Sequence, residues 1–154
     1  MLIDRNNIEN FCKDLRDKKI VFTNGCFDIL HVGHVRYLKA AKALGDVLIV
    51  GLNTDDSVKK LKGNDRPINN EADRAEVLLA LEAVDHVVLF GEQTAESLIA
   101  EVKPNIYVKG GDYTLETLPE AKIVQSYGGR VEFIPMVADR STTNVINKIS
   151  MKKR

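Results

Sequence analysis

Two histidines lie three residues apart in the segment His31-Val-Gly-His34, and they are two of the chain's three histidines. Residues three apart share one face of a helix, so both imidazoles can point at the same anion if a helix begins here. The start of a helix adds free backbone N–H groups and a partial positive charge, and Gly33 lets a ligand approach closely. The spacing indicates an anion site. The alternative is a pair of surface histidines that only help a helix to begin.

The common phosphate-binding fingerprints do not occur around these histidines. Residues 23–34 contain neither the G-x-G-x-x-G of dinucleotide-binding folds nor the G-x-x-x-x-G-K-S/T of phosphate loops. Cys26 has no neighbouring base in the sequence that would activate it as a nucleophile, so we interpret it as a small packed residue. The chemistry favoured at this point is noncovalent binding of phosphate groups.

Short apolar runs alternate with helix-periodic stretches along the whole chain, and they predict the elements that position the histidines. Runs that are apolar on both faces suit strands of a buried parallel sheet, and the helical segments between them imply right-handed crossovers. We predict one domain over residues 1–154, with the last four residues frayed, and a three-layer α/β, Rossmann-like fold around a five-stranded parallel sheet. The predicted strands are 19–23, 47–50, 87–90, 106–108 and 131–134, and the predicted helices lie near 8–15, 35–44, 70–81, 98–102, 121–127 and 141–149.

Ligands of open α/β sheets bind where the carboxyl ends of strands meet the beginnings of helices. This rule directs attention to four junctions, at residues 23–34, 51–66, 108–114 and 138–143, where the unusual residues concentrate. The second junction runs into the polar segment Lys59–Pro67, which we expect to be mobile without ligand because it lacks apolar anchors. We expect the junctions to form one site.

The first junction resembles the signature of the H-x-G-H nucleotidyltransferases, a cytidylyltransferase-like superfamily. The resemblance rests on His31-Val-Gly-His34, on the upstream Gly25-Cys-Phe-Asp28, and on Ser141-Thr-Thr143 at the start of the last predicted helix. These motifs lie more than a hundred residues apart, in the family's order. Members of this family join a nucleotide to a phosphorylated small molecule and release pyrophosphate. The resemblance therefore implies a nucleotidyltransferase fold and an enzyme.

Two further blocks are similar to the adenylyltransferase domains that make ADP-heptose. They are Asn53-Thr-Asp-Asp56 with the following basic loop, and Val108-Lys-Gly-Gly-Asp-Tyr113; the similarity extends from about residue 8 to 149. It implies transfer of AMP from ATP to D-glycero-β-D-manno-heptose 1-phosphate, for lipopolysaccharide core or a related surface glycan. Two alternatives stay open at this point. One is cytidylyl transfer to glycerol 3-phosphate or another small phosphorylated alcohol, and the other is a noncatalytic nucleotide sensor.

The resemblance assigns roles to particular residues. It implies catalytic roles for His31, His34, Lys42 and Lys62. It places the nucleotide on Thr23, Asn24, Gly25, Phe27, Gly33, Asn53, Asp55, Lys109, Gly110, Gly111, Asp112, Ser141, Thr142 and Thr143, and the sugar phosphate near Asp28, Arg66, Arg74 and Arg140. Arg140 departs from the pattern, because related heptose enzymes often carry a small or neutral residue there.

Several of these residues have a purely structural alternative. Lys42 on an exposed helix can be a solvated charge, and Arg74 can pair with Glu71 or another local carboxylate. Helix capping without any ligand would equally explain Asn53, Asp55 and the Ser-Thr-Thr segment.

The composition of the chain limits the kinds of partner and compartment that we expect for it. Lys plus Arg is 22 and Asp plus Glu is 22, and the resulting zero net charge argues against a nucleic-acid partner. The longest apolar run, 46–52, is too short to cross a membrane, and no signal peptide is visible, so we expect a cytoplasmic protein. Two cysteines cannot build a disulfide framework or a four-thiolate zinc site.

The family also implies Mg²⁺, bound mainly through the substrate phosphates with no metal ligands from the protein. It further implies a homodimer or higher homo-oligomer, and a separate heptose kinase that acts upstream.

Overall fold

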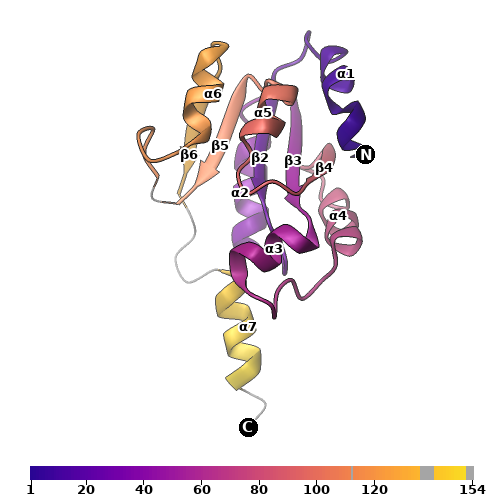
Figure 1. The fold of residues 1–154 in the computed structure, drawn as a ribbon, viewed down its shortest axis with the longest axis vertical. Coiled ribbons are helices and arrows are strands. Elements are labelled where there is room, and N and C mark those ends of the chain that lie inside the picture. The colour runs from indigo at the N-terminus through magenta and orange to yellow at the C-terminus, as the bar shows by residue number, and fades with distance from the viewer. Residues whose placement is uncertain (112, 136–140, 152–154) are drawn as a thin grey trace.

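A six-stranded, all-parallel sheet forms the centre of the chain, as the computed structural model shows for residues 1–111, 113–135 and 141–151 (Figure 1). The order across the sheet is β1-β4-β3-β2-β5-β6. The strands are β1 (Leu2–Ile3), β2 (Ile20–Gly25), β3 (Val47–Asn53), β4 (His86–Phe90), β5 (Ile106–Gly110) and β6 (Arg130–Ile134).

Seven α-helices and one short 3₁₀ helix are described along the same residues. They are η1 (Arg5–Asn7), α1 (Ile8–Lys13), α2 (Val32–Lys42), α3 (Asp55–Lys62), α4 (Glu71–Leu79), α5 (Glu96–Val102), α6 (Glu120–Ser126) and α7 (Thr142–Met151). Within the described part of the chain, no helix is long and apolar enough to cross a lipid bilayer.

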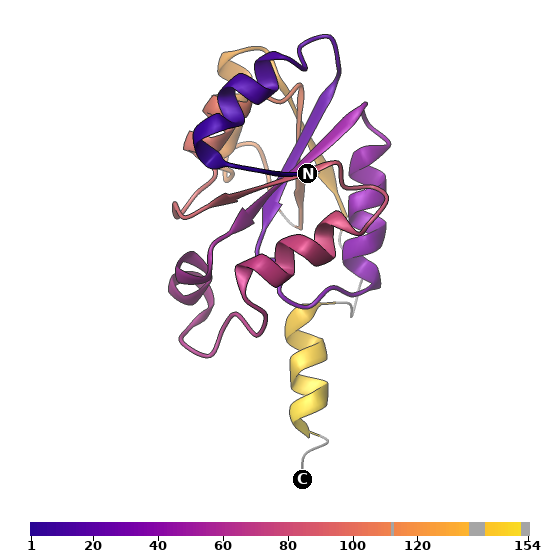
Figure 2. The ribbon, with the colours of Figure 1, turned by 90° about the vertical axis from the view of Figure 1, so that its right-hand side faces the viewer.

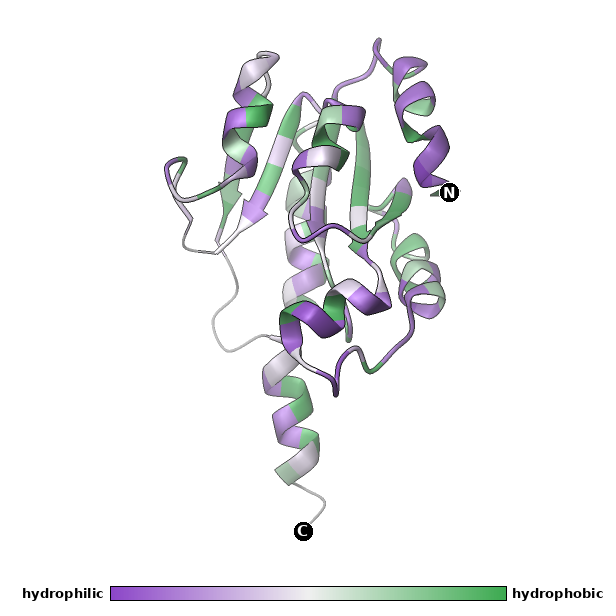
Figure 3. Cartoon of the chain, in the orientation of Figure 1, coloured by the Kyte–Doolittle hydropathy of each residue, from purple (hydrophilic) through white to green (hydrophobic). Residues whose placement is uncertain are grey.

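Helices cover both faces of the sheet, which gives the predicted three layers (Figure 2). Side chains alternate along each strand, so Phe22 packs with α1, α5 and α6 on one face while Val21 packs with α2 and α4 on the other. The strands are accordingly the most apolar elements in Figure 3. The predicted Rossmann-like α/β class is confirmed.

The prediction of five strands is wrong by one. The added strand, β1, has only two residues and pairs with β4 at the edge of the sheet. A run of two residues carries no periodicity, so pattern reading could not detect it. Residues 55–62, which we placed in a junction loop, form α3; Thr54 caps this helix by accepting a hydrogen bond from the backbone N–H of Ser57.

The strand order creates a switch point between β2 and β5. The chain leaves β2 toward β3 and β4 on one side and later returns to place β5 and β6 on the other side. Connections diverge here, which leaves a crevice at the carboxyl ends of the central strands. The beginning of α2 and the ends of β3, β4 and β5 all lie at this edge.

Candidate active site

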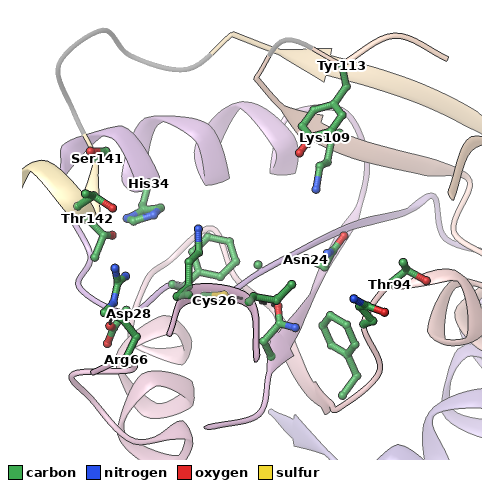
Figure 4. A pocket seen from close by; sticks show the side chains of 18 of the residues that line it. Asn24, Cys26, Asp28, His34, Arg66, Thr94, Lys109, Tyr113, Ser141 and Thr142 are labelled. Atoms are coloured by element: carbon green, nitrogen blue, oxygen red, sulfur yellow. Dashed lines mark hydrogen bonds and ion pairs between the residues drawn. The ribbon is translucent and has the colours of Figure 1, made fainter. Parts of the chain in front are cut away.

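A cavity of about 510 Å³ opens at the carboxyl ends of β2, β3, β4 and β5 (Figure 4). All four predicted junctions contribute residues to its wall; the junctions at 23–34 and 51–66 are described in full, and those at 108–114 and 138–143 are described except for residues 112 and 138–140. The predicted site residues that line it are Asn24, Gly25, Phe27, Asp28, His31, His34, Asn53, Lys62, Arg66, Lys109, Ser141, Thr142 and Thr143.

The two imidazoles are built into the start of α2. The backbone N–H of Gly33 donates to Nδ1 of His31 at 3.1 Å, and the backbone N–H of His31 donates to Nδ1 of His34 at 3.3 Å. These bonds form a reciprocal capping box. Because each Nδ1 accepts a hydrogen bond, a neutral ring carries its proton on Nε2. The ring centroids lie 4.0 Å apart, so the sequence prediction of a shared face is confirmed.

His34 is neutral at physiological pH. Burial, and after it the nearby His31, lower its pKa to about 4. The ring of Phe27, 5.3 Å from that of His34 between centroids, is part of its apolar surroundings. His34 therefore offers a hydrogen bond from Nε2–H and not a full positive charge.

The segment after β2 is shaped by close backbone packing. Phe27 has a φ of 44°, in the left-handed region that side chains rarely adopt. Its ring folds back over Gly25, where an added Cβ would lie only 2.9 Å from a ring carbon. A glycine is required at position 25 for this reason, and the turn carries Phe27 into the cavity wall.

Asp28 anchors the loop that follows α3. Its carboxylate accepts hydrogen bonds from Nε of Arg66 at 2.9 Å and from the backbone N–H groups of Ile68 and Asn69. Burial alone would raise the pKa of Asp28, but these hydrogen bonds hold it below its ordinary value. Asp28 and Arg66 both line the cavity, and they are bound to each other there.

Arg74, which the resemblance places near the sugar phosphate, does not line the cavity. Its side chain is fully buried, and it donates to the carbonyl oxygens of Cys26, Asn53 and Asn69 and to the carboxylate of Asp55. The guanidinium holds together the segments that follow β2 and β3. Asp55 is the acidic partner in this arrangement, and it is not among the residues that line the cavity.

Lys42, which the resemblance places near the phosphates, lies at the end of α2 away from the cavity. Lys42 is the last residue of α2, and its ammonium group donates to the carboxylate of Asp85 and the carbonyl of Asp46, at the amino ends of β3 and β4. Eight residues beyond His34, at 1.5 Å per residue, place it roughly 12 Å further along the helix. Sequence spacing did not distinguish the two ends of α2.

Two other predicted nucleotide contacts are structural. Thr23 is fully buried, and its hydroxyl bonds to Tyr37 and to the carbonyl oxygen of Val108. Gly33 is buried, and its N–H is used by His31.

The glycine loop after β5 lies partly in the site. Gly110 lines a second cavity of about 310 Å³ that shares a wall with the first, whereas Gly111 lines neither of these two cavities. The predictions for Asp112 and Arg140 concern positions outside the described residues.

The start of α7 brings a second helix terminus to the cavity. Ser141 caps it by accepting from the N–H of Asn144 at 3.0 Å, and the Thr142 hydroxyl donates to the carbonyl oxygen of Ile29 at 2.9 Å. Figure 4 shows Ser141 and Thr142 on the same side of the cavity as His34 and Arg66. Two helix N-termini with their positive partial charges thus meet at one end, which is suited to a polyphosphate.

The opposite end of the cavity was largely missed. Our junctions omitted the one after residues 87–90, although the rule for strand ends applies equally to that strand. The lining residues that sequence reasoning did not assign are Cys26, Leu61, Phe90, Gln93, Thr94, Tyr113 and Glu120. Among the described residues, no group of three or more His, Cys, Asp or Glu side chains is arranged to hold a metal ion.

A family model described as cytidylyltransferase-like matches residues 22–150, the region that contains both histidines and all the strands around the cavity. The chain belongs to the cytidylyltransferase-like family. The confirmed family agrees with the resemblance of His31-Val-Gly-His34 and Ser141-Thr-Thr143.

Curated relatives are longer than this chain. The "Bifunctional protein HldE" of Geobacter metallireducens is 59% identical over 134 residues, covering 87% of this chain and 27% of the relative. The protein of the same name in a Nitratiruptor species is 55% identical over 148 residues, 95% of this chain and 31% of the relative. The chain therefore spans about three tenths of these relatives.

Solved structures share the architecture. A "lipopolysaccharide core biosynthesis protein" from Thermoplasma volcanium has 33% identity and a TM-score of 0.62, with 78% of this chain and 97% of that one covered. A pantothenate synthetase from Thermus thermophilus has a TM-score of 0.61 at 16% identity, covering 88% of this chain and 62% of the other. The second likeness concerns the fold alone.

Proposed function

We propose that this chain is an adenylyltransferase that transfers AMP from ATP to D-glycero-β-D-manno-heptose 1-phosphate, giving ADP-heptose and pyrophosphate. The observation that carries the proposal is the capping box of His31 and His34 at the start of α2, which places both imidazoles and a helix terminus at one end of the cavity. The high identity to the bifunctional HldE proteins and the likeness to a lipopolysaccharide core biosynthesis protein support the substrate.

The reaction needs no nucleophilic side chain. A phosphate oxygen of the sugar 1-phosphate attacks the α-phosphorus of ATP in line, and the bond from that phosphorus to the bridging oxygen of the β-phosphate breaks. The chain's contribution is to bring two polyanions together and to stabilise the negative charge that develops on pyrophosphate. Preorganised donors at such a position contribute on the order of 10² to 10³ in rate each.

Each donor has a distinct origin. His34 donates from its neutral ring, and the beginning of α7 presents Ser141 and Thr142 beside it. Lys62, the last residue of α3, lines the same cavity and supplies a flexible positive charge. Mg²⁺ enters as the magnesium complex of the substrate ATP, held by phosphate oxygens and water.

The test is a pyrophosphate-release assay with ATP or CTP, each combined with heptose 1-phosphate or glycerol 3-phosphate. We expect turnover for ATP with heptose 1-phosphate. Turnover only for CTP with glycerol 3-phosphate would replace the proposal with polyol-phosphate cytidylyl transfer. Nucleotide binding without turnover of any pair would indicate a sensor module.

The reaction implies further partners. A kinase must supply heptose 1-phosphate, and the ADP-heptose formed is consumed by glycosyl transfer to lipopolysaccharide core or a related surface glycan. We place the reaction in the cytoplasm because ATP is its substrate; the two cysteines are free thiols, which is compatible with a reducing compartment.

We also propose a homodimer or higher homo-oligomer. Helix α7 has no buried residue, and it exposes Ile149 and Met151 as it extends from the body of the molecule (Figures 1 and 3). Size-exclusion chromatography with light scattering checks the oligomer, and a monomer at all concentrations would contradict it.

A further inference from the structure

Glu120 is a buried carboxylate that no part of the mechanism uses. It is the first residue of α6, it is only 5% exposed, and it lines the main cavity. Its Oε2 atom has no hydrogen-bond partner among the described residues. Leaving a buried polar oxygen without a donor is costly, and buried polar groups are normally satisfied. The missing donor is therefore to be sought in the ligand.

The neighbouring groups do not satisfy this carboxylate. The hydroxyl of Tyr107 donates to Oδ1 of Asn24 and is thus already used. Burial raises the pKa of Tyr107, and the negative charge of Glu120 raises it further, which places the carboxylate close to this pair. The ammonium group of Lys109 lies 5.0 Å from the centre of the Tyr113 ring.

Charge separates the two ends of the cavity. The phosphate end has the ammonium group of Lys62, the ion pair of Arg66 with Asp28, the imidazoles of His31 and neutral His34, and the two helix termini. Glu120 belongs to α6, which covers the other face of the sheet from α2. A carboxylate repels phosphate, so Glu120 selects a neutral part of a substrate that offers hydrogen-bond donors.

The second cavity is a side branch of the main one. It shares eight lining residues with the main cavity, Lys109 among them, and adds Tyr37 and Gly110. Glu120 lines the main cavity and not this branch, and the same holds for Gln93, Thr94 and Phe90. In Figure 4, Thr94 lies at the end of the cavity away from Arg66 and Ser141. These four residues supply a carboxylate, an amide, a hydroxyl and an aromatic ring, the groups that bind the hydroxyls and apolar face of a sugar ring.

We propose that Glu120 accepts hydrogen bonds from hydroxyl groups of the acceptor sugar, and that Gln93, Thr94 and Glu120 form the sugar subsite of the main cavity. The inference rests on the proposed function, and it assigns the nucleoside to the branch along Lys109 and Gly110. The ribose of ATP offers the same chemistry, a pair of neighbouring hydroxyls, and the experiment below separates the two sources.

Steady-state kinetics of Glu120→Gln tests the assignment. We expect the KM for heptose 1-phosphate to rise about tenfold or more, because a hydrogen bond to a charged acceptor is lost, while the KM for ATP changes by less than about twofold. The matched control is Glu116→Gln, an exposed glutamate on the segment before α6, which should leave both KM values unchanged.

Monodeoxy analogues of heptose 1-phosphate identify the hydroxyls. Wild type should bind at least one analogue about tenfold more weakly than the parent sugar, and Glu120→Gln should lose that discrimination. A purely structural role for Glu120 would not abolish discrimination. Isothermal titration with the sugar phosphates, in the presence of a nonhydrolysable ATP analogue, gives the same comparison without turnover.

Unchanged KM values in Glu120→Gln would overturn the proposal, and so would a variant that still discriminates against the monodeoxy sugar phosphates. A third contrary result is a rise confined to the KM for ATP, together with lost discrimination against 2′- or 3′-deoxy-ATP. That result would assign Glu120 to the ribose. Failure of the proposed function is seen separately, as absence of ADP-heptose formation by wild type.

Discussion

Each imidazole of the active site does two things with its two nitrogens. The Nδ1 atoms of His31 and His34 accept hydrogen bonds from backbone N–H groups and so cap the start of α2, and the proton of each neutral ring is then on Nε2. Replacement by alanine would remove the cap and the donor together. Asparagine is a good residue at the N-cap, and glutamine at the third helical position can reach back to the N-cap N–H. Asparagine at position 31 and glutamine at position 34 therefore keep the helix cap while they remove the imidazole, so they test the chemistry without disrupting α2.

We predict that His31→Asn and His34→Gln each lower kcat by roughly 10² to 10³-fold, because each removes one donor to the leaving pyrophosphate. Helix α2 should remain intact, as judged by circular dichroism. Lys39→Gln, an exposed substitution on the same helix, serves as control and should keep wild-type turnover. Wild-type turnover in both folded histidine variants would rule out their catalytic role.

The low pKa of His34 predicts a loss of stability in mild acid. The unfolded chain takes up a proton at His34 below pH 6.5, whereas the folded chain does so only near pH 4. The unfolded state therefore binds more protons in this window, and the free energy of unfolding falls as the pH is lowered through it. The pKa of Asp28 is lowered from 3.8, so its contribution is lost at more acidic pH.

Urea unfolding of wild type and His34→Gln at pH values between 7 and 4 measures this effect. The variant should lose less stability between pH 7 and 5 than wild type. Some pH dependence should persist in the variant, because burial also lowers the pKa of His86. Identical pH dependence of the two proteins would show that His34 titrates normally in the folded state.

At the scale of elements, two buried charged residues hold the loops of the site. Asp28 fixes the segment after α3, and Arg74 on α4 fixes the ends of β2 and β3. Neither is available to the substrate in this arrangement. Their role is to position the lining residues, and the free energy of unfolding of suitable variants tests this role.

We predict that Arg74→Met lowers the free energy of unfolding by about 3 to 5 kcal/mol, since it leaves three carbonyl oxygens and the carboxylate of Asp55 without their donor. Arg130→Met, which removes an exposed pair with Glu132, should cost less than about 1 kcal/mol. Chemical denaturation of both variants provides the comparison. Equal losses would contradict a special role for Arg74.

The last turn of α3 and the segment that follows it divide into an exposed part and an anchored part. Residues 59–65 are all exposed, whereas Arg66, Ile68 and Asn69 are bound to Asp28. Exposed backbone with few apolar contacts opens easily. We predict that a nonhydrolysable ATP analogue slows amide hydrogen exchange at 59–65, as Lys62 engages the phosphates, and changes 66–69 little. If the analogue leaves the rate of amide hydrogen exchange at 59–65 unchanged, this segment does not close over the nucleotide.

At the scale of the whole molecule, the all-parallel topology accounts for both the success and the failures of sequence-based prediction. Apolar runs mark the five long strands, most clearly the central β2 and β3, which have buried residues on both faces, and strand ends then locate the junctions. Periodicity does not reveal which end of a helix faces the site, so Lys42 was misplaced. It also does not reveal burial of a charged side chain, so Arg74 was taken for a ligand contact although its partners, the carbonyl oxygens of distant segments, are visible only in the fold. Glu120 was missed for the same reason, because it reaches the cavity only once α6 packs on the sheet.

The choice of nucleotide depends on the whole crevice, since the base must fit between the end of β5 and the elements around it. Adenine and cytosine differ in size and in the donors along their edges. A site that satisfies hydrogen bonds discriminates by powers of ten, whereas pocket size alone discriminates far less. The branch along Lys109 and Gly110 brings backbone close to the ligand. We predict that kcat/KM for ATP exceeds that for CTP by at least about a hundredfold with heptose 1-phosphate, equivalent to roughly 2.7 kcal/mol. Parallel measurement of both nucleotides decides the point: comparable efficiencies would indicate a permissive base site, and a preference for CTP would favour the cytidylyltransferase reaction.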